Sequence, residues 1–434
     1  MTKPGSFSNA RLVATLALAM GVMSFDQCGI GFLLPFMKPE LHLTNTQIGM
    51  IASIYWVAFA VASYGVGILA DARGSARNFL VVVLGVFGLG SLLSGLVGGV
   101  SSLLAARAVM GMLAGALLTL GQSVLGSCSP PDKVGTNMGL VTGLGSSLSG
   151  LVVAPIVLVQ IASAFGWRLG YLAIALPAWL AAALVYRNVV DATRPMATPA
   201  DIKPPRAILS GMRAVMRYRN IVLCSLLCSL SVAYVGLGFT FLPTYFVTVR
   251  GFSPTQMSGL VVVLGLSSIV FAIALPAISN RFGRKPVLVA ACCTSILAPL
   301  AAYYYDGSVI ILGSLLFLGW SISGTGAFSM GIIPAETVDG ALLSRALGSV
   351  IALGVLLGGL AGPMVAGWSA DRWGGGAPLL VQAACAAVAG FVAFGLQETA
   401  PRVLASRNAK AQNIAASARV VPAAVAPDAP CRQC

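Results

Sequence analysis

Long apolar stretches separated by short polar segments recur along the whole 434-residue chain. Most of them hold about 20 residues or more, which lets a helix cross the ~30 Å hydrocarbon core of a bilayer. The strands of a membrane barrel would instead alternate apolar and polar positions over about ten residues, and the chain lacks that alternation. The pattern predicts an all-α membrane protein with twelve transmembrane helices, at 12–37, 46–70, 78–99, 102–126, 135–163, 169–187, 220–247, 255–279, 286–304, 309–333, 343–368 and 378–398.

Composition agrees with lipid as the solvent for most of the chain. Hydrophobic residues make up 58% of the sequence. Charged residues make up 9%, whereas soluble domains hold about 25%. So much apolar surface is too large for one fold that faces water, and we expect the lipid bilayer to cover it.

The net charge of +14 raises the question of nucleic-acid binding, so the placement of the basic residues matters. Most of the 26 lysines and arginines fall in alternate polar segments, including the N-terminus, residues 187–219 and the C-terminal tail. The other set of segments holds Lys38, Arg168, Arg250 and Arg372. This is the positive-inside bias of membrane proteins. It predicts cytoplasmic N and C termini in a bacterial inner membrane, and it explains the charge without nucleic acid.

A polar segment at 188–219, which is interrupted by prolines, divides the twelve predicted helices into two groups of six. We predict an N-terminal six-helix bundle at 1–187, a cytoplasmic linker at 188–219 and a C-terminal six-helix bundle at 220–399. Residues 400–434 are rich in alanine and proline and are predicted to form a disordered cytoplasmic tail.

The two halves look like copies of each other. Asp71 follows the second predicted helix and Asn280 follows the eighth, 209 residues later. Pro155 lies in the fifth predicted helix and Pro363 in the eleventh, 208 residues later. A shared offset predicts two pseudo-symmetric bundles, an arrangement that places a substrate site between the halves near the middle of the membrane.

The segments after the second and eighth predicted helices resemble the signature motif of the major facilitator superfamily, Gly-x-x-x-Asp-(Arg/Lys)-x-Gly-(Arg/Lys)-(Arg/Lys). The first copy contains Gly67, Asp71 and Gly74, with Arg73 nearby, and the second contains Asn280, Arg281, Gly283, Arg284 and Lys285. The resemblance covers residues 11 to about 400. It implies the twelve-helix major facilitator fold and secondary active transport by alternating access.

Three further segments are similar to the anion:cation symporter branch of that superfamily, which carries sugar acids and other organic anions. They are Phe25-Asp26, Arg107-x-x-x-Gly111 and Pro334-Ala-Glu336-Thr-Val. This similarity implies a carrier that takes up a small organic anion together with protons.

Away from the ends of the predicted helices, Asp26 is the only acid and Arg107 is the only base. Asp26 lies roughly 21 Å along its helix, where an ionised carboxylate costs about 2.5–3.5 kcal/mol and usually marks a proton or ion path. We therefore predict that Asp26 couples transport to protons; a neutral Asp26 bonded to a neighbouring helix is the structural alternative. The planar guanidinium of Arg107 is predicted to bind an anionic substrate or to pair with Asp26, and its alternative is to snorkel to the outer interface.

A second group of candidates consists of polar and aromatic residues within predicted helices that face each other across the halves. Such groups can orient a solute in an apolar cleft, although each of them is more often a packing or interface residue. The group contains Gln27, Tyr55, Gln122, Tyr234 and Trp320.

The polar segments also offer candidates for gates. Asp71, at the inner end of the second predicted helix, can pair with helix-end donors or with a basic residue of the other half. Glu336 and Asp339 lie at the predicted inner mouth and are expected to form a gate salt bridge, with Arg345 as the candidate partner, rather than to bind substrate.

Other function classes lack the residues that they need. The chain has no phosphate loop of the form Gly-x-x-x-x-Gly-Lys-(Ser/Thr), so ATP-driven transport is not expected. A membrane enzyme would need a cluster of catalytic side chains at membrane depth, but the single histidine, His42, lies in the first outer loop. A receptor of the same fold would be expected to lose coupling groups such as Asp26. We expect a monomer without metal or cofactor, driven by the proton gradient.

The direction of transport is predicted from the fifth helix. Drug/proton antiporters of the superfamily usually carry a Gly-Pro-Gly-Gly-like signature there, and this chain has Ala154-Pro155-Ile-Val. Uptake of a small carboxylate or sugar acid is therefore preferred, and a proton-coupled exporter of drugs or metabolites is the alternative.

Overall fold

The computed structural model describes residues 6–73, 76–130, 133–189 and 212–405. Within these ranges the chain forms twelve helices that are long and apolar enough to cross a membrane, and it forms no strand. The prediction of an all-α chain with twelve spans is confirmed. Most of the predicted linker, at 190–211, and of the predicted tail, at 406–434, lies outside the described residues.

The first six spans form the N-terminal bundle. They are α1 (Ser6–Glu40), α2 (Asn45–Arg73), α3 (Ala76–Ser94), α4 (Val100–Cys128), a composite fifth span and α7 (Trp167–Asn188). The fifth span consists of α5 (Val134–Met138), the π-helical segments η1 (Gly139–Gly145) and η2 (Leu148–Val153), and α6 (Ala154–Phe165). Pro155 has no N–H to donate to the carbonyl of Leu151, which accounts for the irregular turns before it.

The last six spans form the C-terminal bundle. They are α9 (Arg219–Thr248), α10 (Pro254–Phe282), a ninth span, a tenth span, α15 (Gly340–Trp373) and α16 (Ala377–Phe394). The ninth span consists of α11 (Arg284–Thr294) and α12 (Leu297–Tyr304). The tenth consists of α13 (Val309–Gly319), η4 (Ser321–Thr325), η5 (Phe328–Ile332) and α14 (Ile333–Thr337).

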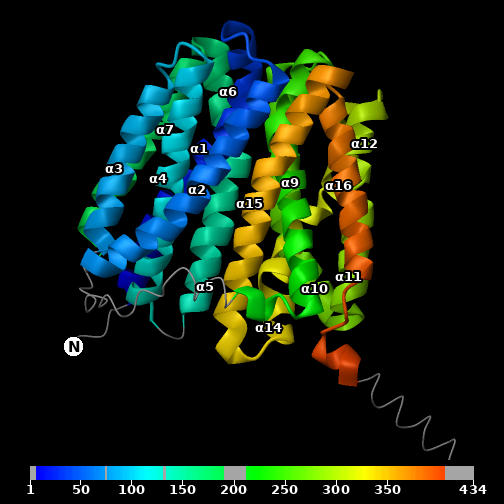
Figure 1. Cartoon of the computed structure of the whole chain (residues 1–434). Helices are drawn as coiled ribbons and strands as arrows, with labels where there is room; N and C mark the ends of the chain where they lie inside the picture. Colours follow the sequence, from blue (N-terminus) through cyan, green and yellow to red (C-terminus); the bar gives the residue numbers. More distant parts are fainter. Residues whose placement is uncertain (1–5, 74–75, 131–132, 190–211, 406–434) are drawn as a thin grey trace, which may run out of the picture.

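The spans run side by side between two faces of the molecule (Figure 1). The start of α1 and the end of α16 lie on one face, which we call the termini face. The loops at 41–44 and 374–376 lie on the other, which we call the loop face. That the termini face is cytoplasmic stays a prediction from the basic residues.

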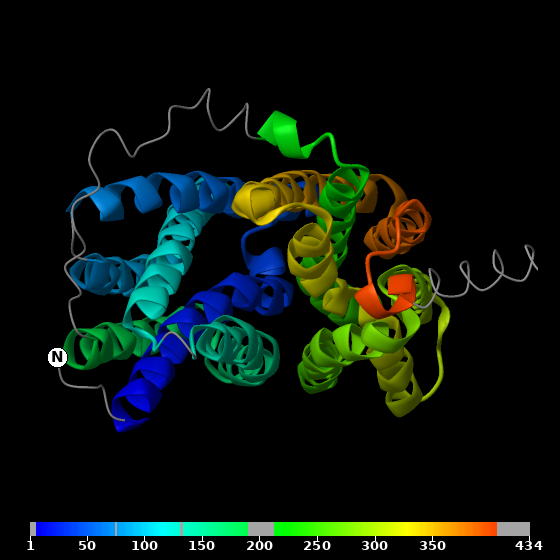
Figure 2. The ribbon, with the colours of Figure 1, turned by 90° about the horizontal axis from the view of Figure 1, so that it is seen from below.

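The two bundles stand next to each other and are seen end-on in Figure 2. α2 packs on α15, α10 packs on η2 and α6, and α1 packs on α9. The second span thus meets the eleventh, and the fifth meets the eighth. These reciprocal pairs are what two repeats related by an axis along the spans should give, as the shared sequence offset predicts.

Close helix approach holds the bundles together near the loop face. Gly49 of α2 lies directly against the backbone carbonyl of Pro363 in α15, so that a β-carbon at position 49 would overlap it. Small residues of this kind let two helix backbones come close and gain packing in lipid. The contact holds α2 against α15 at the interface between the bundles.

Candidate functional site

A cavity of about 270 Å³ lies between the bundles. The N-terminal bundle contributes side chains of α1, α2 and α4 and Leu151 of η2, and the C-terminal bundle contributes side chains of α9 and of the tenth span. The lining residues are Gln27, Cys28, Ile30, Ile51, Ala52, Tyr55, Trp56, Arg107, Leu151, Ser231, Val232, Val235, Gly236, Phe239, Thr240, Ile322, Ser323, Gly326 and Met330. The cavity therefore occupies the position between the halves that the internal repeat predicts.

An ion pair between Arg107 and Asp26 adjoins this cavity. Arg107 of α4 lies 3.2 Å from Asp26 of α1, measured between Nη1 and Oδ2, and Nη2 lies 3.4 Å from Oδ1. Their side chains are 1% and 0% exposed. Arg107 also donates to Ser94 Oγ at 3.2 Å and lies over the ring of Tyr171. Arg107 thus points to Asp26 and not to the loop-face boundary, which corrects the snorkelling alternative.

Burial makes the two charges depend on each other. Removing one partner of a buried ion pair leaves an uncompensated charge and costs about 3–5 kcal/mol. Arg107 lines the cavity, while Asp26 lies behind it and outside the lining. Any change in the charge of Asp26 is therefore transmitted to the cavity through Arg107.

Two of the residues that line the cavity carry a buried polar atom without a hydrogen-bond partner. These atoms are Nε of Arg107 and the hydroxyl of Tyr55. Leaving such a group unpaired costs about 1–3 kcal/mol, so a ligand with an acceptor oxygen would gain by satisfying either one. Gln27 also lines the cavity, which brings together three of the predicted substrate-binding residues.

The other three predicted binding residues lie elsewhere. The Tyr234 hydroxyl donates to the backbone carbonyls of Ser295 and Gly319, at 2.7 and 3.0 Å. Trp320 Nε1 donates to Ser268 Oγ at 3.1 Å. Both side chains are buried within the C-terminal bundle, where Trp320 supports the cavity wall by packing on Phe239. Gln122 is exposed and does not line the cavity.

Several lining residues escaped the sequence analysis. Trp56 and Phe239 face the cavity from opposite bundles, and Ser231, Thr240 and Ser323 add hydroxyls on the side of the C-terminal bundle. A single available signal was the run Tyr55-Trp56 in a span otherwise rich in small and aliphatic residues. That signal does not reveal which side of the helix faces the other bundle.

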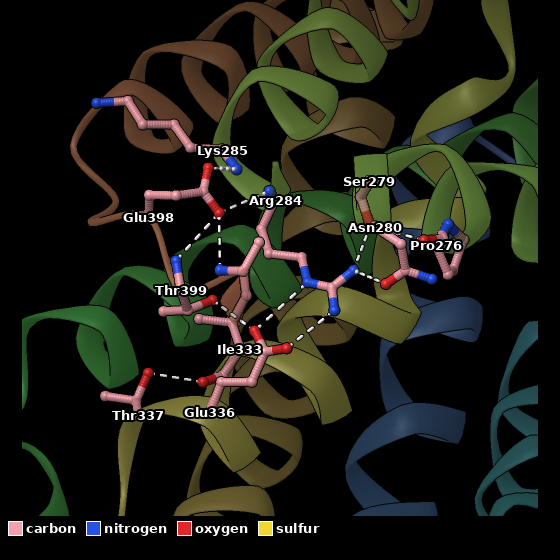
Figure 3. Close-up of polar contacts among 11 residues, drawn as sticks. Pro276, Ser279, Asn280, Arg284, Lys285, Ile333, Glu336, Thr337, Glu398 and Thr399 are labelled. Carbon is pink, nitrogen blue, oxygen red and sulfur yellow. Dashed lines mark hydrogen bonds and ion pairs between the residues drawn. The ribbon is translucent and has the colours of Figure 1, made fainter. Parts of the chain in front are cut away.

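The second copy of the sequence motif forms a polar network on the termini face (Figure 3). Asn280 and Arg281 lie in the last turn of α10, and Arg284 and Lys285 begin α11. Gly283 between them has φ of +104°, a conformation that favours glycine. Arg281 is exposed to solvent. The motif is therefore a sharp helix-to-helix turn.

Arg284 is the centre of this network. Its guanidinium donates to Glu336 at 2.9 Å, to Ser279 at 2.6 Å and to Asn280 at 2.8 Å. The predicted partner of Glu336 was Arg345, which is exposed to solvent on α15. This expectation is corrected, because α14 carries Glu336 to the start of α11 and Arg284 satisfies it there (Figure 3).

Glu398 closes the network from beyond α16. Its carboxylate accepts the backbone N–H groups of Arg284, Lys285, Thr399 and Ala400 at 2.8–3.1 Å. Partial burial raises the pKa of Glu398, but these four donors outweigh it and hold the pKa below its usual value. Glu398 therefore ties the last segment to the N-terminus of α11.

The first copy of the motif is only partly described. Gly67, Asp71 and Arg73 lie in the last turns of α2, which extends further than the predicted helix, and nothing is described of their side chains. Gly74 lies outside the described residues. The gating role of this copy stays a prediction.

A hydrogen-bonded link between the bundles lies on the loop face and was not predicted. Asp371 near the end of α15 accepts the N–H groups of Asn45 and Thr46 at 2.9 and 2.7 Å, and Asn45 Nδ2 at 2.8 Å. A carboxylate satisfies free N–H groups at the start of a helix and interacts well with its dipole. Asp371 thus caps α2 from the opposite bundle. We call this contact the loop-face latch.

Comparisons with known proteins agree with this geometry. The chain is 27% identical over 393 residues to a hexuronate transporter of Bacillus subtilis (strain 168), covering 85% of this chain and 90% of the relative. It is 24% identical over 376 residues to a candidate niacin/nicotinamide transporter of the same strain, covering 86% of this chain and 91% of that relative. The fold is similar to the crystal structure of a mutant nucleoside transporter, with a TM-score of 0.75 at 15% identity, covering 89% of this chain and 99% of that one.

A sequence model of the family described as Major Facilitator Superfamily matches residues 16–347. The match and the twelve apolar spans make the protein an integral, multi-pass membrane transporter of the secondary type, and not an enzyme. Its relatives include carriers of organic acids. The chain belongs to the major facilitator superfamily.

Proposed function

We propose that this protein takes up a small organic carboxylate together with protons by alternating access. The observation that carries the proposal is the buried pair of Asp26 and Arg107 at the wall of the cavity. Arg107 is the only charged residue among the described residues of the lining, and one of its donors, Nε, has no partner. A carboxylate is the solute group that a guanidinium binds best.

The pair also provides a mechanism for coupling. While Asp26 is ionised it neutralises Arg107, and a second carboxylate in the cavity would add an excess negative charge. When Asp26 takes up a proton, Arg107 loses its counter-ion and a solute carboxylate can replace it. Proton and solute therefore favour each other's binding, because either one alone leaves a buried charge uncompensated. Such mutual dependence is what symport requires.

Alternating access needs contacts that open and close between the bundles. Several hydrogen bonds that join the bundles lie toward the loop face. They include the loop-face latch and the bonds from Ser53 to the Leu360 carbonyl and from Ser258 to the Pro155 carbonyl. Release of these contacts would open the cavity to that side, as in rocking transitions between two packed domains.

The relatives support the same substrate class. Hexuronates and niacin each carry a carboxylate, although nicotinamide, named for the same relative, is neutral. The cavity is slightly smaller than the ~300–1,000 Å³ of drug-sized pockets, which favours a small solute over the bulky drugs of an exporter.

The test uses purified protein in liposomes, with nicotinate as the probe carboxylate, because benzoic acid crosses lipid unaided as the neutral acid and would accumulate in an alkaline interior without a carrier. An imposed gradient, acid outside, should drive nicotinate above its external concentration in liposomes with the wild-type protein, and much faster than in protein-free liposomes. Asp26→Asn should keep exchange of labelled for unlabelled nicotinate but lose gradient-driven accumulation. Accumulation that persists in Asp26→Asn would show that Asp26 does not couple transport to protons.

A further inference from the structure

We propose that the solute is a compact monocarboxylate built on a flat apolar ring, and not a polyhydroxylated sugar acid. The inference rests on the proposed function, because it takes the carboxylate and Arg107 as given. It concerns the remainder of the solute and depends on which groups of the cavity are still free to bind it.

Few polar groups of the cavity are free. Ser323 donates its hydroxyl proton to the backbone carbonyl of Trp320 at 2.8 Å. Ser231 lies 3.0 Å from the hydroxyl of Thr325, which itself donates to the Ile322 carbonyl, so Ser231 is the donor of that pair. The hydroxyls of Ser231 and Ser323 are therefore already used within the C-terminal bundle and have no proton left to donate.

The side-chain donors that remain are Gln27, Tyr55, Thr240, the indole N–H of Trp56 and the Nε of Arg107, while Ser231 and Ser323 can only accept a hydrogen bond. Two of these donors are needed for the carboxylate. A sugar acid carries a hydroxyl on nearly every ring carbon. Each hydroxyl of the solute that is buried without a hydrogen-bond partner loses its bonds to water and forms none in their place. A site with few free polar groups therefore discriminates strongly against such a solute. A ring without hydroxyls carries no such penalty.

The apolar walls suit a flat ring. Trp56 faces the cavity from α2 and Phe239 faces it from α9. Each is held by aromatic neighbours: Trp56 by Tyr55, with ring centroids 6.0 Å apart, and Phe239 by Trp320, at 5.4 Å. Such supported rings offer fixed surfaces against which an aromatic solute can stack or pack edge-on. The other walls are aliphatic, among them Ile30, Ile51 and Val235.

The charge of the cavity limits the solute to one carboxylate. Arg107 is the single cation among the described lining residues, and the C-terminal bundle adds none. A dicarboxylate would therefore place its second charge against apolar or neutral groups. Burial of an unpaired carboxylate is far more costly than burial of a hydroxyl, which excludes small dicarboxylates more firmly than sugar acids.

The experiment compares the dissociation constants of five probes for the purified protein: benzoate, cyclohexanecarboxylate, glucuronate, succinate and benzamide. Benzoate should bind at least about tenfold more tightly than glucuronate or succinate. It should also bind severalfold more tightly than cyclohexanecarboxylate, which has the same carboxylate but no flat ring. Benzamide has the ring without the charge and should bind weakest among the ring compounds.

A matched pair of variants locates the ring. Phe239→Leu should remove the preference for benzoate over cyclohexanecarboxylate. Phe246→Leu changes a buried phenylalanine of the same helix that does not line the cavity, and it should leave the preference unchanged. A preference that survives Phe239→Leu, with both variants folded, would overturn the placement of the ring.

The outcomes separate the two proposals. If glucuronate or succinate binds as tightly as benzoate, carboxylate transport stands and the ring-carboxylate inference is wrong. If benzamide binds as tightly as benzoate, Arg107 does not select a carboxylate and the proposed function itself fails. If none of the carboxylates binds, both are contradicted.

Discussion

Arg107 holds Asp26 through two N–H···O contacts of 3.2 and 3.4 Å at a depth where neither side chain meets solvent. The pair joins α1 to α4 inside one bundle, yet Arg107 also forms part of the wall between the two bundles. A change of proton occupancy at Asp26 therefore alters the charge that the cavity presents, which connects a proton to a solute without direct contact between them.

Removal of Arg107 should destabilise the protein more than removal of the whole pair. Arg107→Ala leaves Asp26 as a buried charge without a partner and should lower stability by about 3–5 kcal/mol, or force Asp26 to take up a proton. The double variant Asp26→Asn/Arg107→Ala should recover most of that loss. Thermal unfolding of the two variants and the wild type measures the difference. Additive losses would mean that the two residues do not depend on each other.

Tyr55→Phe should lower the affinity for the solute without lowering the stability of the protein. The Tyr55 hydroxyl is buried without a hydrogen-bond partner, so its removal should leave stability unchanged or slightly higher. If the hydroxyl binds the solute, affinity should fall by about three- to tenfold, as expected for one lost hydrogen bond. Titration with benzoate and a melting curve give the two readouts. Unchanged affinity would exclude Tyr55 from the binding site.

Asp371→Ala should release the loop-face latch. The substitution removes the acceptor for the N–H groups of Asn45 and Thr46, and loss of a helix cap costs about 0.5–2 kcal/mol. Hydrogen exchange at the first turn of α2 should become faster, because this face opens more often. Asp306→Ala is the control, since Asp306 pairs with Arg250 within the C-terminal bundle. Equal effects of both variants would mean that Asp371 does not join the bundles.

Glu398 should make the stability of the folded protein depend on pH. Its pKa is lowered in the folded protein, so its contribution to stability is present above the usual value of 4.5 and is lost as pH falls through the folded-state pKa. Glu398→Gln should therefore melt at a lower temperature than the wild type at pH 7. The gap between them should narrow steadily below about pH 4.5. Melting curves at a series of pH values test this, with the exposed Asp339→Asn as control. A gap that is independent of pH would contradict it.

The sequence predicts the fold well because each span can be recognised from its own run of apolar residues. The predicted span 169–187 corresponds to Trp167–Asn188, and the predicted 378–398 to Ala377–Phe394. Pairing with Asp26 was one of the roles predicted for Arg107, because a buried charge in an apolar helix is stabilised by a partner of opposite charge.

The cavity could be predicted only in part, because an apolar helix does not encode how it is rotated toward its neighbours. Tyr55 lines the cavity, whereas Tyr234 points into its own bundle and bonds backbone carbonyls. The partner of Glu336 was missed for a related reason: Arg284 is 52 residues away and meets it only through tertiary packing. Nothing in the sequence marks Asp371 as a helix cap, because the start of α2 reaches it only through tertiary packing.

The most direct test of the account measures protons at the moment of binding. Benzoate is added to purified protein in weakly buffered solution at neutral pH, and a pH indicator reports proton uptake. The account predicts that the wild-type protein takes up about one proton per benzoate bound, and that Asp26→Asn binds benzoate without taking up any. Benzoate binding to the wild type without proton uptake, or undiminished uptake in Asp26→Asn, would contradict the coupling of solute to Asp26 through Arg107.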